Sequence, residues 1–244
     1  MKILITNDDG INAKGINILS NCIKECFKQN DVTIKVVAPS TEMSAVSQKL
    51  SLREGLTIEK RQDIVDGIES YAVEGTPCDC VKVAYNHLNY IPDIVFTGIN
   101  NGYNVGNDIL YSGTLAAAFE ARLYGCKAVA FSCKYNSEIK KDNIIKTLEY
   151  IYKNKLVEEL SILNINIPEE VTGFKITKQG ELPFQSTYVK KQDGKYYLEG
   201  IMVEKRNNDE TTDVFAINDK KVSITYLTTD RTDYILYNKH LNKA

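Results

Sequence analysis

Met1-Lys2-Ile3-Leu4-Ile5-Thr6-Asn7-Asp8-Asp9-Gly10 opens the chain with an apolar run that leads directly into two acidic residues. Residues 3–6 predict a buried strand, which ends at two adjacent carboxylates. Neighbouring carboxylates repel each other when both are ionised, and leaving either one without water is costly. A divalent cation would resolve both problems, because Mg²⁺ and Mn²⁺ favour carboxylate, amide and hydroxyl oxygens. The alternative is an ordinary strand-to-helix turn in which Asp9 or Asn12 caps the helix.

Through the first two thirds of the chain, apolar segments typical of strands alternate with segments that have apolar residues at the helical spacing of three to four. The expected strands are 3–6, 33–38, 50–59, 69–73, 93–97, 128–132 and 161–167, and the expected helices are 14–28, 77–88, 113–124 and 142–160. Thr76 and Ser112 are expected helix caps, and residues 98–108 are expected to form a loop. This alternation predicts an α/β fold with a mainly parallel sheet and helices on both faces.

The pattern changes after residue 172 and predicts a second region. Short strands are expected at 174–177, 187–190, 196–198 and 222–226, with a hairpin turn at Asp193-Gly194. We therefore expect a catalytic core over 1–172 and a C-terminal region over 173–244. Within that region, 173–212 should form antiparallel hairpin extensions, and 213–240 should return to the core or form a terminal arm.

Three loops that follow parallel strands are rich in oxygen ligands. They contain Asp8 and Asp9, hydroxyls after Pro39, and amides in the segment 98–102. Ligands of such sheets bind at the carboxyl ends of the strands, where these loops should meet. The chain has no phosphate-binding loop of the G-x-x-x-x-G-K-[ST] type and no G-x-G-x-x-G after the first strand. Ser112 opens an Ala-rich helix whose N-terminus could bind phosphate or simply be capped by that serine.

Composition excludes several classes of function. The net charge of −2 argues against a general affinity for nucleic acid duplexes. Two histidines exclude a multi-histidine metal site, and the six cysteines lack C-x₂-C spacing, which favours buried free thiols in the cytoplasm. We expect neither a signal peptide nor a membrane span.

Five motifs follow one another through residues 1–135. They are Asn7-Asp8-Asp9-Gly10 with Gly15-Ile16, Val37-Ala38-Pro39 followed by Ser44, Gly75-Thr76-Pro77-Cys78-Asp79-Cys80-Val81, Thr97-Gly98-Ile99-Asn100-Asn101-Gly102, and Asn104 with Gly106 through Tyr111-Ser112-Gly113-Thr114. In these motifs the chain resembles the SurE family of metal-dependent survival-protein nucleotidases. The Asn-Asp-Asp-Gly motif alone would be weak support for this resemblance. Chance agreement of all five motifs, in the order of the family, is negligible.

The resemblance implies a Rossmann-like fold and hydrolysis of nucleoside 5′- or 3′-monophosphates, in some members with exopolyphosphatase activity. It places the ligands of one Mg²⁺ or Mn²⁺ ion per subunit on Asp8, Asp9, Ser44 and Asn100. Asp8, Asp9 and Asn100 are also the expected catalytic residues. The residues expected to bind phosphate are Asn104, Ser112, Gly113 and Thr114. The resemblance also implies a homodimer or homotetramer that exchanges C-terminal segments.

The chain departs from the family pattern beside Ser44. The family usually has Asp and basic residues where Ser40, Thr41, Glu42 and Met43 stand, and Lys14 replaces a usual Pro. Phosphate affinity or substrate preference is therefore expected to differ, and Ser40 and Ser47 are alternative hydroxyl ligands. Two alternative functions are a phosphotransferase with an aspartyl-phosphate intermediate, against which the adjacent Asp8 and Asp9 argue, and a non-catalytic nucleotide-binding or sensor module, which the altered loop 40–43 favours.

Overall fold

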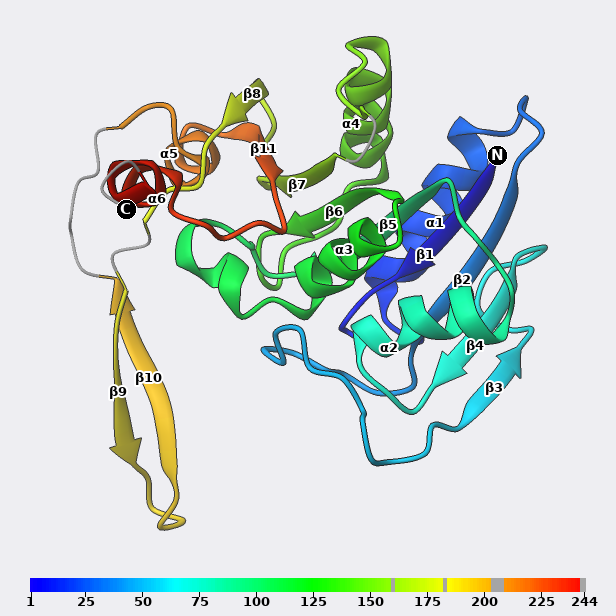
Figure 1. The fold of residues 1–244 in the computed structure, drawn as a ribbon, viewed down its shortest axis with the longest axis horizontal. Coiled ribbons are helices and arrows are strands. Elements are labelled where there is room, and N and C mark those ends of the chain that lie inside the picture. The colour runs from blue at the N-terminus through cyan, green and yellow to red at the C-terminus, as the bar shows by residue number, and fades with distance from the viewer. Residues whose placement is uncertain (159–160, 182–183, 203–208, 242–244) are drawn as a thin grey trace.

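The computed structural model describes residues 1–158, 161–181, 184–202 and 209–241 (Figure 1). Its strands are β1 (Lys2–Thr6), β2 (Thr33–Pro39), β3 (Ile58–Arg61), β4 (Glu69–Val73), β5 (Ile94–Asn101), β6 (Lys127–Cys133), β7 (Ile162–Ile167), β8 (Gly173–Thr177), β9 (Phe184–Lys190), β10 (Tyr196–Met202) and β11 (Lys221–Leu227). Nine of them form one sheet in the order β3-β4-β2-β1-β5-β6-β7-β11-β8. The run from β4 to β7 is parallel, which confirms the predicted α/β class.

Helices cover both faces of this sheet. The covering helices are α1 (Lys14–Cys26), α2 (Pro77–Lys82) continued by the π-helix η1 (Val83–His87), α3 (Gly113–Leu123), α4 (Lys141–Lys153) and α5 (Asp213–Asn218). The 3₁₀ helix η2 (Gly106–Leu110) follows β5, and the last helix, α6 (Tyr234–Leu241), has no buried residue. Strand β1 shows why there are two cores: Ile3 and Ile5 point into the cluster beneath α1 and α4, whereas Leu4 points into the cluster beneath α2 and α3. In the described part of the chain, no helix is long and apolar enough to span a membrane.

Helix α3 approaches the sheet closely because small side chains face each other across the contact. Ala117, Ala118 and Ala121 share one buried cluster with Ala128 and Ala130 of β6. The helix begins at Ser112, whose hydroxyl accepts a hydrogen bond from the Leu115 amide at 3.2 Å, as predicted for an N-cap. This packing brings the N-terminus of α3 to the carboxyl end of β1.

Four of the expected elements were wrong in part. Residues 50–57 are loop, since Ser51 donates from its amide and hydroxyl to Asp79 of α2 and pairing with β4 starts only at Ile58. Strand β5 runs on to Asn101 through an irregularity after Thr97, and the expected 98–108 loop also contains η2. Helix α4 ends at Lys153; the last expected residues, 159–160, lie outside the described ones.

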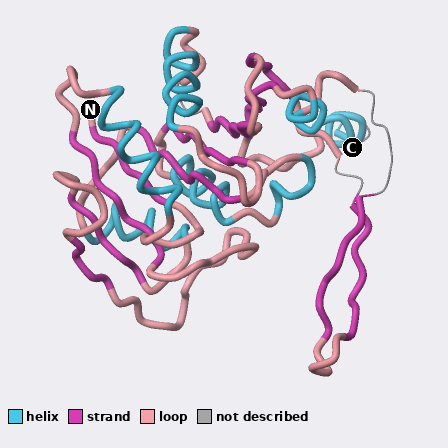
Figure 2. Tube along the Cα trace, turned by 180° about the vertical axis from the view of Figure 1, so that it is seen from behind, coloured by secondary structure: helices cyan, strands magenta, loops and turns pink. Residues whose placement is uncertain are grey.

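The C-terminal region divides into two parts. Strands β8 and β11 belong to the main sheet, with β11 antiparallel to β7 and parallel to β8, so residues 173–177 are not the extension hairpin expected from the sequence. Strands β9 and β10 form a separate antiparallel hairpin around the predicted Asp193-Gly194 turn. Figures 1 and 2 both show this hairpin reaching away from the sheet. The boundary at residue 172 stays a prediction.

Candidate metal and phosphate site

Asp8 lies at the floor of the site, at the carboxyl end of β1. Its side chain is 3% exposed, and Oδ1 accepts a short hydrogen bond from the Thr114 hydroxyl of α3. Burial raises the pKa of Asp8 to about 6; the Thr114 bond opposes this rise and the charge of Asp9 adds to it. An ionised Asp8 is therefore unfavourable here unless a cation accompanies it.

Asp9 is turned toward the neighbouring strand and is less deeply buried. Its Oδ2 accepts a hydrogen bond from the Asn101 amide of β5 at 3.1 Å. Burial raises its pKa, the Asn101 bond lowers it, and the charge of Glu42 raises it further. Gly10 has a φ of +94°, and a Cβ atom there would lie 3.2 Å from the Thr41 carbonyl carbon. This backbone bend lets two adjacent carboxylates serve one site.

The loop after β2 brings a hydroxyl and a third acid to the cluster. The Met43 amide donates to the Asp8 carbonyl at 2.7 Å, which fixes the loop beside β1. Ser44 lines the cleft and its hydroxyl donates to Glu42 Oε1 at 2.8 Å. The alternative hydroxyl of Ser47 instead donates to the Leu110 carbonyl at 3.0 Å. Of the three serines considered from the sequence, Ser44 is the one on the cleft wall.

Asn100 lies opposite Asp9 because β5 continues past its irregularity. Its Nδ2 donates to the Gly102 carbonyl at 2.8 Å, which fixes the orientation of the amide group on the cleft wall. Gly98 is needed for the close packing behind it, because a Cβ atom there would lie 2.3 Å from the Phe131 carbonyl oxygen. Asp8, Asp9, Ser44 and Asn100 therefore line one cleft, as expected from the sequence.

The predicted phosphate-binding residues separate into two pairs. Asn104 and Ser112 line the cleft, and Asn104 Nδ2 donates to the Ser132 hydroxyl at 2.9 Å. Gly113 and Thr114 lie behind Asp8; Thr114 is fully buried, and a Cβ atom on Gly113 would lie 2.9 Å from Asp8 Cβ. The second pair is therefore placed to position Asp8.

Asp213 holds the wall of the site from the C-terminal region. Its fully buried carboxylate accepts hydrogen bonds from the amides of Gly106, Gly180 and Val214 at 2.8–2.9 Å. Asn166 Oδ1 accepts from the Asn104 amide at 2.8 Å. The segment 104–106 is thus held from both β7 and α5. Sequence reasoning missed Asp213, and nothing local in Thr212-Asp213 signals that three distant segments meet there.

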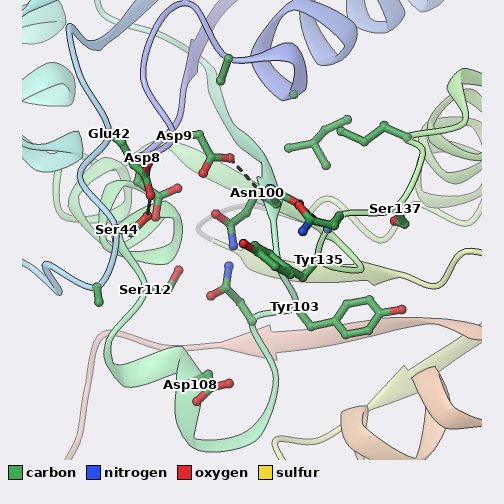
Figure 3. Close-up of a pocket in the computed structure, with 18 of the residues that line it drawn as sticks. Asp8, Asp9, Glu42, Ser44, Asn100, Tyr103, Asp108, Ser112, Tyr135 and Ser137 are labelled. Carbon is green, nitrogen blue, oxygen red and sulfur yellow. Dashed lines mark hydrogen bonds between the residues drawn. The ribbon is translucent and has the colours of Figure 1, made fainter. Parts of the chain in front are cut away.

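The cleft has a volume of about 1300 Å³. Figure 3 shows Asp8, Asp9, Glu42 and Ser44 on one side of it and Tyr103, Tyr135 and Ser137 on the other. The acidic residues that line the cleft are Asp8, Asp9, Glu42, Asp108 and Glu138. In the part of the chain that the structure describes, the basic residue that lines it is Lys14. This negative cleft favours a cation and would repel a phosphate without one.

The donor set fits a hard divalent cation. Two carboxylates, a hydroxyl and an amide face one cleft, and both carboxylates have a raised pKa, Asp8 while nearly fully buried. Within the described residues, no group of three or more His, Cys, Asp or Glu side chains has the geometry to hold a metal. The site must therefore depend on neutral oxygens beside its two carboxylates. All six cysteines are free thiols, and five are buried.

Comparison with known proteins gives one consistent family. The family model described as survival protein SurE matches residues 3–186. The 5′-nucleotidase SurE of Caldanaerobacter subterraneus subsp. tengcongensis is 37% identical over 95% of this chain and 93% of its own length. That of Pelobacter propionicus is 38% identical over 96% of each chain. The crystal structure of the SurE protein from Aquifex aeolicus covers all of both chains with a TM-score of 0.79 and 32% identity.

Proposed function

This chain belongs to the SurE family of survival proteins, and we propose that Asp8, Asp9, Ser44 and Asn100 hold one Mg²⁺ or Mn²⁺ ion per subunit. The chain is a phosphoric monoester hydrolase that acts on nucleoside monophosphates, as its close relationship to several 5′-nucleotidases indicates. The family is metal-dependent. The observation that carries the proposal is the buried Asp8 beside Asp9 at the floor of an acidic cleft.

The ion would supply positive charge for the phosphate oxygens and lower the pKa of a water molecule. The residues of the chain position the reactants. Thr114 holds the Asp8 carboxylate, and Asn101 holds Asp9, which is the more accessible of the pair and suits the orientation of an attacking water. That water would approach phosphorus opposite the departing ribose oxygen.

Ser112 and Asn104 are proposed to bind the phosphate from the other side. The Ser112 hydroxyl accepts a hydrogen bond from Leu115, which leaves its own proton free to donate to a phosphate oxygen. The N-terminus of α3 adds favourable partial positive charge at the same place. Lys14, on the cleft wall, brings a further positive charge. These donors offset the repulsion between phosphate and the acidic lining.

The C-terminal region 173–244 is proposed to serve assembly into a homodimer or homotetramer with exchanged segments. Helix α6 supports this proposal because Tyr234, Ile235, Leu236, Tyr237 and Leu241 are each more than half exposed. The six free thiols support the cytoplasm as the location.

A screen of phosphate release would test the proposed site. Wild type and Asp8→Asn would be assayed on 5′- and 3′-mononucleotides with Mg²⁺, Mn²⁺ or EDTA. We expect release from AMP with either ion, almost none in EDTA, and a loss of at least a hundredfold for Asp8→Asn. Near-wild-type turnover by Asp8→Asn, or full activity in EDTA, would overturn the assignment. A trapped phospho-enzyme would favour the aspartyl-phosphate mechanism over direct attack by water.

A further inference from the structure

The cleft is longer than the catalytic cluster. Asp8 follows β1, whereas Tyr135 and Ile139 line the same cleft from the segment after β6. Strand β5 lies between β1 and β6 in the sheet. Neighbouring strands are about 4.8 Å apart, so the end of β6 lies about 10 Å from the end of β1. A bound phosphate at Asp8 therefore leaves room for the rest of the nucleotide along the cleft.

The far part of the cleft differs in chemistry from the near part. Tyr103 and Tyr135 line it in Figure 3, and the apolar side chains that line the cleft as a whole are Ile18, Ile139 and Leu198 among others. Burial raises the pKa of Tyr103 to about 12, so its phenol stays neutral at physiological pH. An apolar and aromatic wall suits a flat, weakly polar group and offers little to a phosphate.

Tyr135 combines an exposed ring with a fixed backbone. Its side chain is 67% exposed and, in Figure 3, extends toward Asn100. The next residue donates from its amide to Asn101 Oδ1 at 2.8 Å, and Ser137 closes the turn by donating from its hydroxyl to the Lys134 carbonyl at 2.7 Å. The turn that carries the ring is thus tied to the strand that supplies Asn100. An uncovered aromatic ring held in this way is suited to stacking on a ligand.

We propose that Tyr135 stacks on the nucleobase of the substrate, with Tyr103 as the adjoining wall of a base subsite. This inference rests on the proposed nucleotidase function, which supplies the phosphate end of the ligand. Every base has a π-face, so stacking is tolerant of base identity. The subsite therefore selects nucleotides over phosphomonoesters that lack a base, and discriminates less among the bases themselves.

Two variants at this position separate the ring from its hydroxyl. With Mn²⁺ present, Tyr135→Ala should raise KM for AMP about tenfold and leave kcat nearly unchanged, because the loss of one stacked ring weakens binding by about that factor. Kinetics on ribose 5-phosphate, which has no base, should not change. Tyr135→Phe keeps the stacking face and should behave as wild type on both substrates. Tyr226→Ala is the matched control, since Tyr226 is 45% exposed and does not line the cleft.

A binding measurement makes the test independent of catalysis. Calorimetry with adenosine and EDTA-treated protein should give wild-type affinity for Tyr135→Phe and about tenfold weaker binding for Tyr135→Ala. Equal effects of Tyr135→Ala on AMP and ribose 5-phosphate would overturn the subsite, as would unchanged adenosine affinity. Failure of the nucleotidase function would instead appear as wild-type protein that binds adenosine yet releases no phosphate from either substrate.

Discussion

Replacing Asp8 by Asn should stabilise the metal-free protein while removing its response to divalent cations. Asp8 is 3% exposed, and burial is the main reason that its pKa rises from 3.8 to about 6. A shift of this size makes the ionised carboxylate cost about 3 kcal/mol of folding free energy at neutral pH. Asparagine carries no charge, and its Oδ1 can still accept the hydrogen bond from Thr114.

The dependence of this effect on pH has a definite sign. The folded protein keeps the Asp8 proton to a higher pH than the unfolded chain does, because the folded pKa is raised. The free energy of unfolding of the wild type should therefore fall as pH rises from about 4 to about 6, and the loss should be complete above that range. Asp8→Asn should lack this contribution, so the two proteins should differ most at pH 7–8 and least near pH 4.

Urea unfolding in EDTA, followed by circular dichroism, measures the difference. At pH 8 we expect the free energy of unfolding of Asp8→Asn to exceed that of wild type by about 1–3 kcal/mol. For a chain of this size, each kcal/mol raises Tm by about 2–4 °C. Saturating Mn²⁺ at a hundred times its Kd should stabilise wild type by about 2.7 kcal/mol and the variant hardly at all. Asp219→Asn is the control, because Lys221 lowers the pKa of Asp219 and neutralisation there should not stabilise. If Asp8→Asn is less stable than wild type in EDTA at pH 8, the buried Asp8 charge does not destabilise the metal-free protein.

Three further changes test the supports of the site. Thr114→Val removes the donor to Asp8 and should weaken Mn²⁺ binding about tenfold by calorimetry; unchanged affinity would show that the bond does not orient the ligand. Gly113→Ala would place its Cβ 2.9 Å from Asp8 Cβ and should lower kcat about tenfold or more. The control Gly173→Ala, whose Cβ would have no atom within 4 Å, should have little effect, and equal loss of kcat in both variants would contradict the packing of Gly113 against Asp8. Asp213→Ala leaves three backbone amides without their acceptor and should lower the free energy of unfolding by about 3 kcal/mol, measured by urea; a change below about 0.5 kcal/mol would contradict the role given to this carboxylate.

Local signals predicted the parts of the fold that depend on local physics. The apolar run before Asp8 became β1, and Thr76-Pro77 began a helix that Thr76 and Asp79 cap reciprocally. The cluster of Asp8, Asp9, Ser44 and Asn100 followed from parallel topology and from the resemblance to a family. These residues meet because the strands that carry them are neighbours in the sheet.

The features that sequence reasoning missed depend on distant partners. Residues 50–57 have the composition of a strand, yet the Ser51 hydroxyl donates a hydrogen bond to Asp79 of α2. Pairing with β4 therefore begins only at Ile58. Strand β8 joins the sheet only because β11, more than forty residues later, supplies its partner. Asp213 acquires its role from Gly106 and Gly180, which no periodicity connects to it.

Hydrolysis is proposed to require one divalent ion bound by the cluster of Asp8 and Asp9. The most direct test adds Mn²⁺ in steps to EDTA-treated protein while electron paramagnetic resonance follows free Mn²⁺ and a second channel follows phosphate release from AMP. We expect one tightly bound ion per chain, activity that rises in proportion to its occupancy, and loss of both signals in Asp9→Asn. Full activity before any ion binds would contradict the requirement for a metal ion. Undiminished Mn²⁺ binding by Asp9→Asn would contradict its assignment to this cluster.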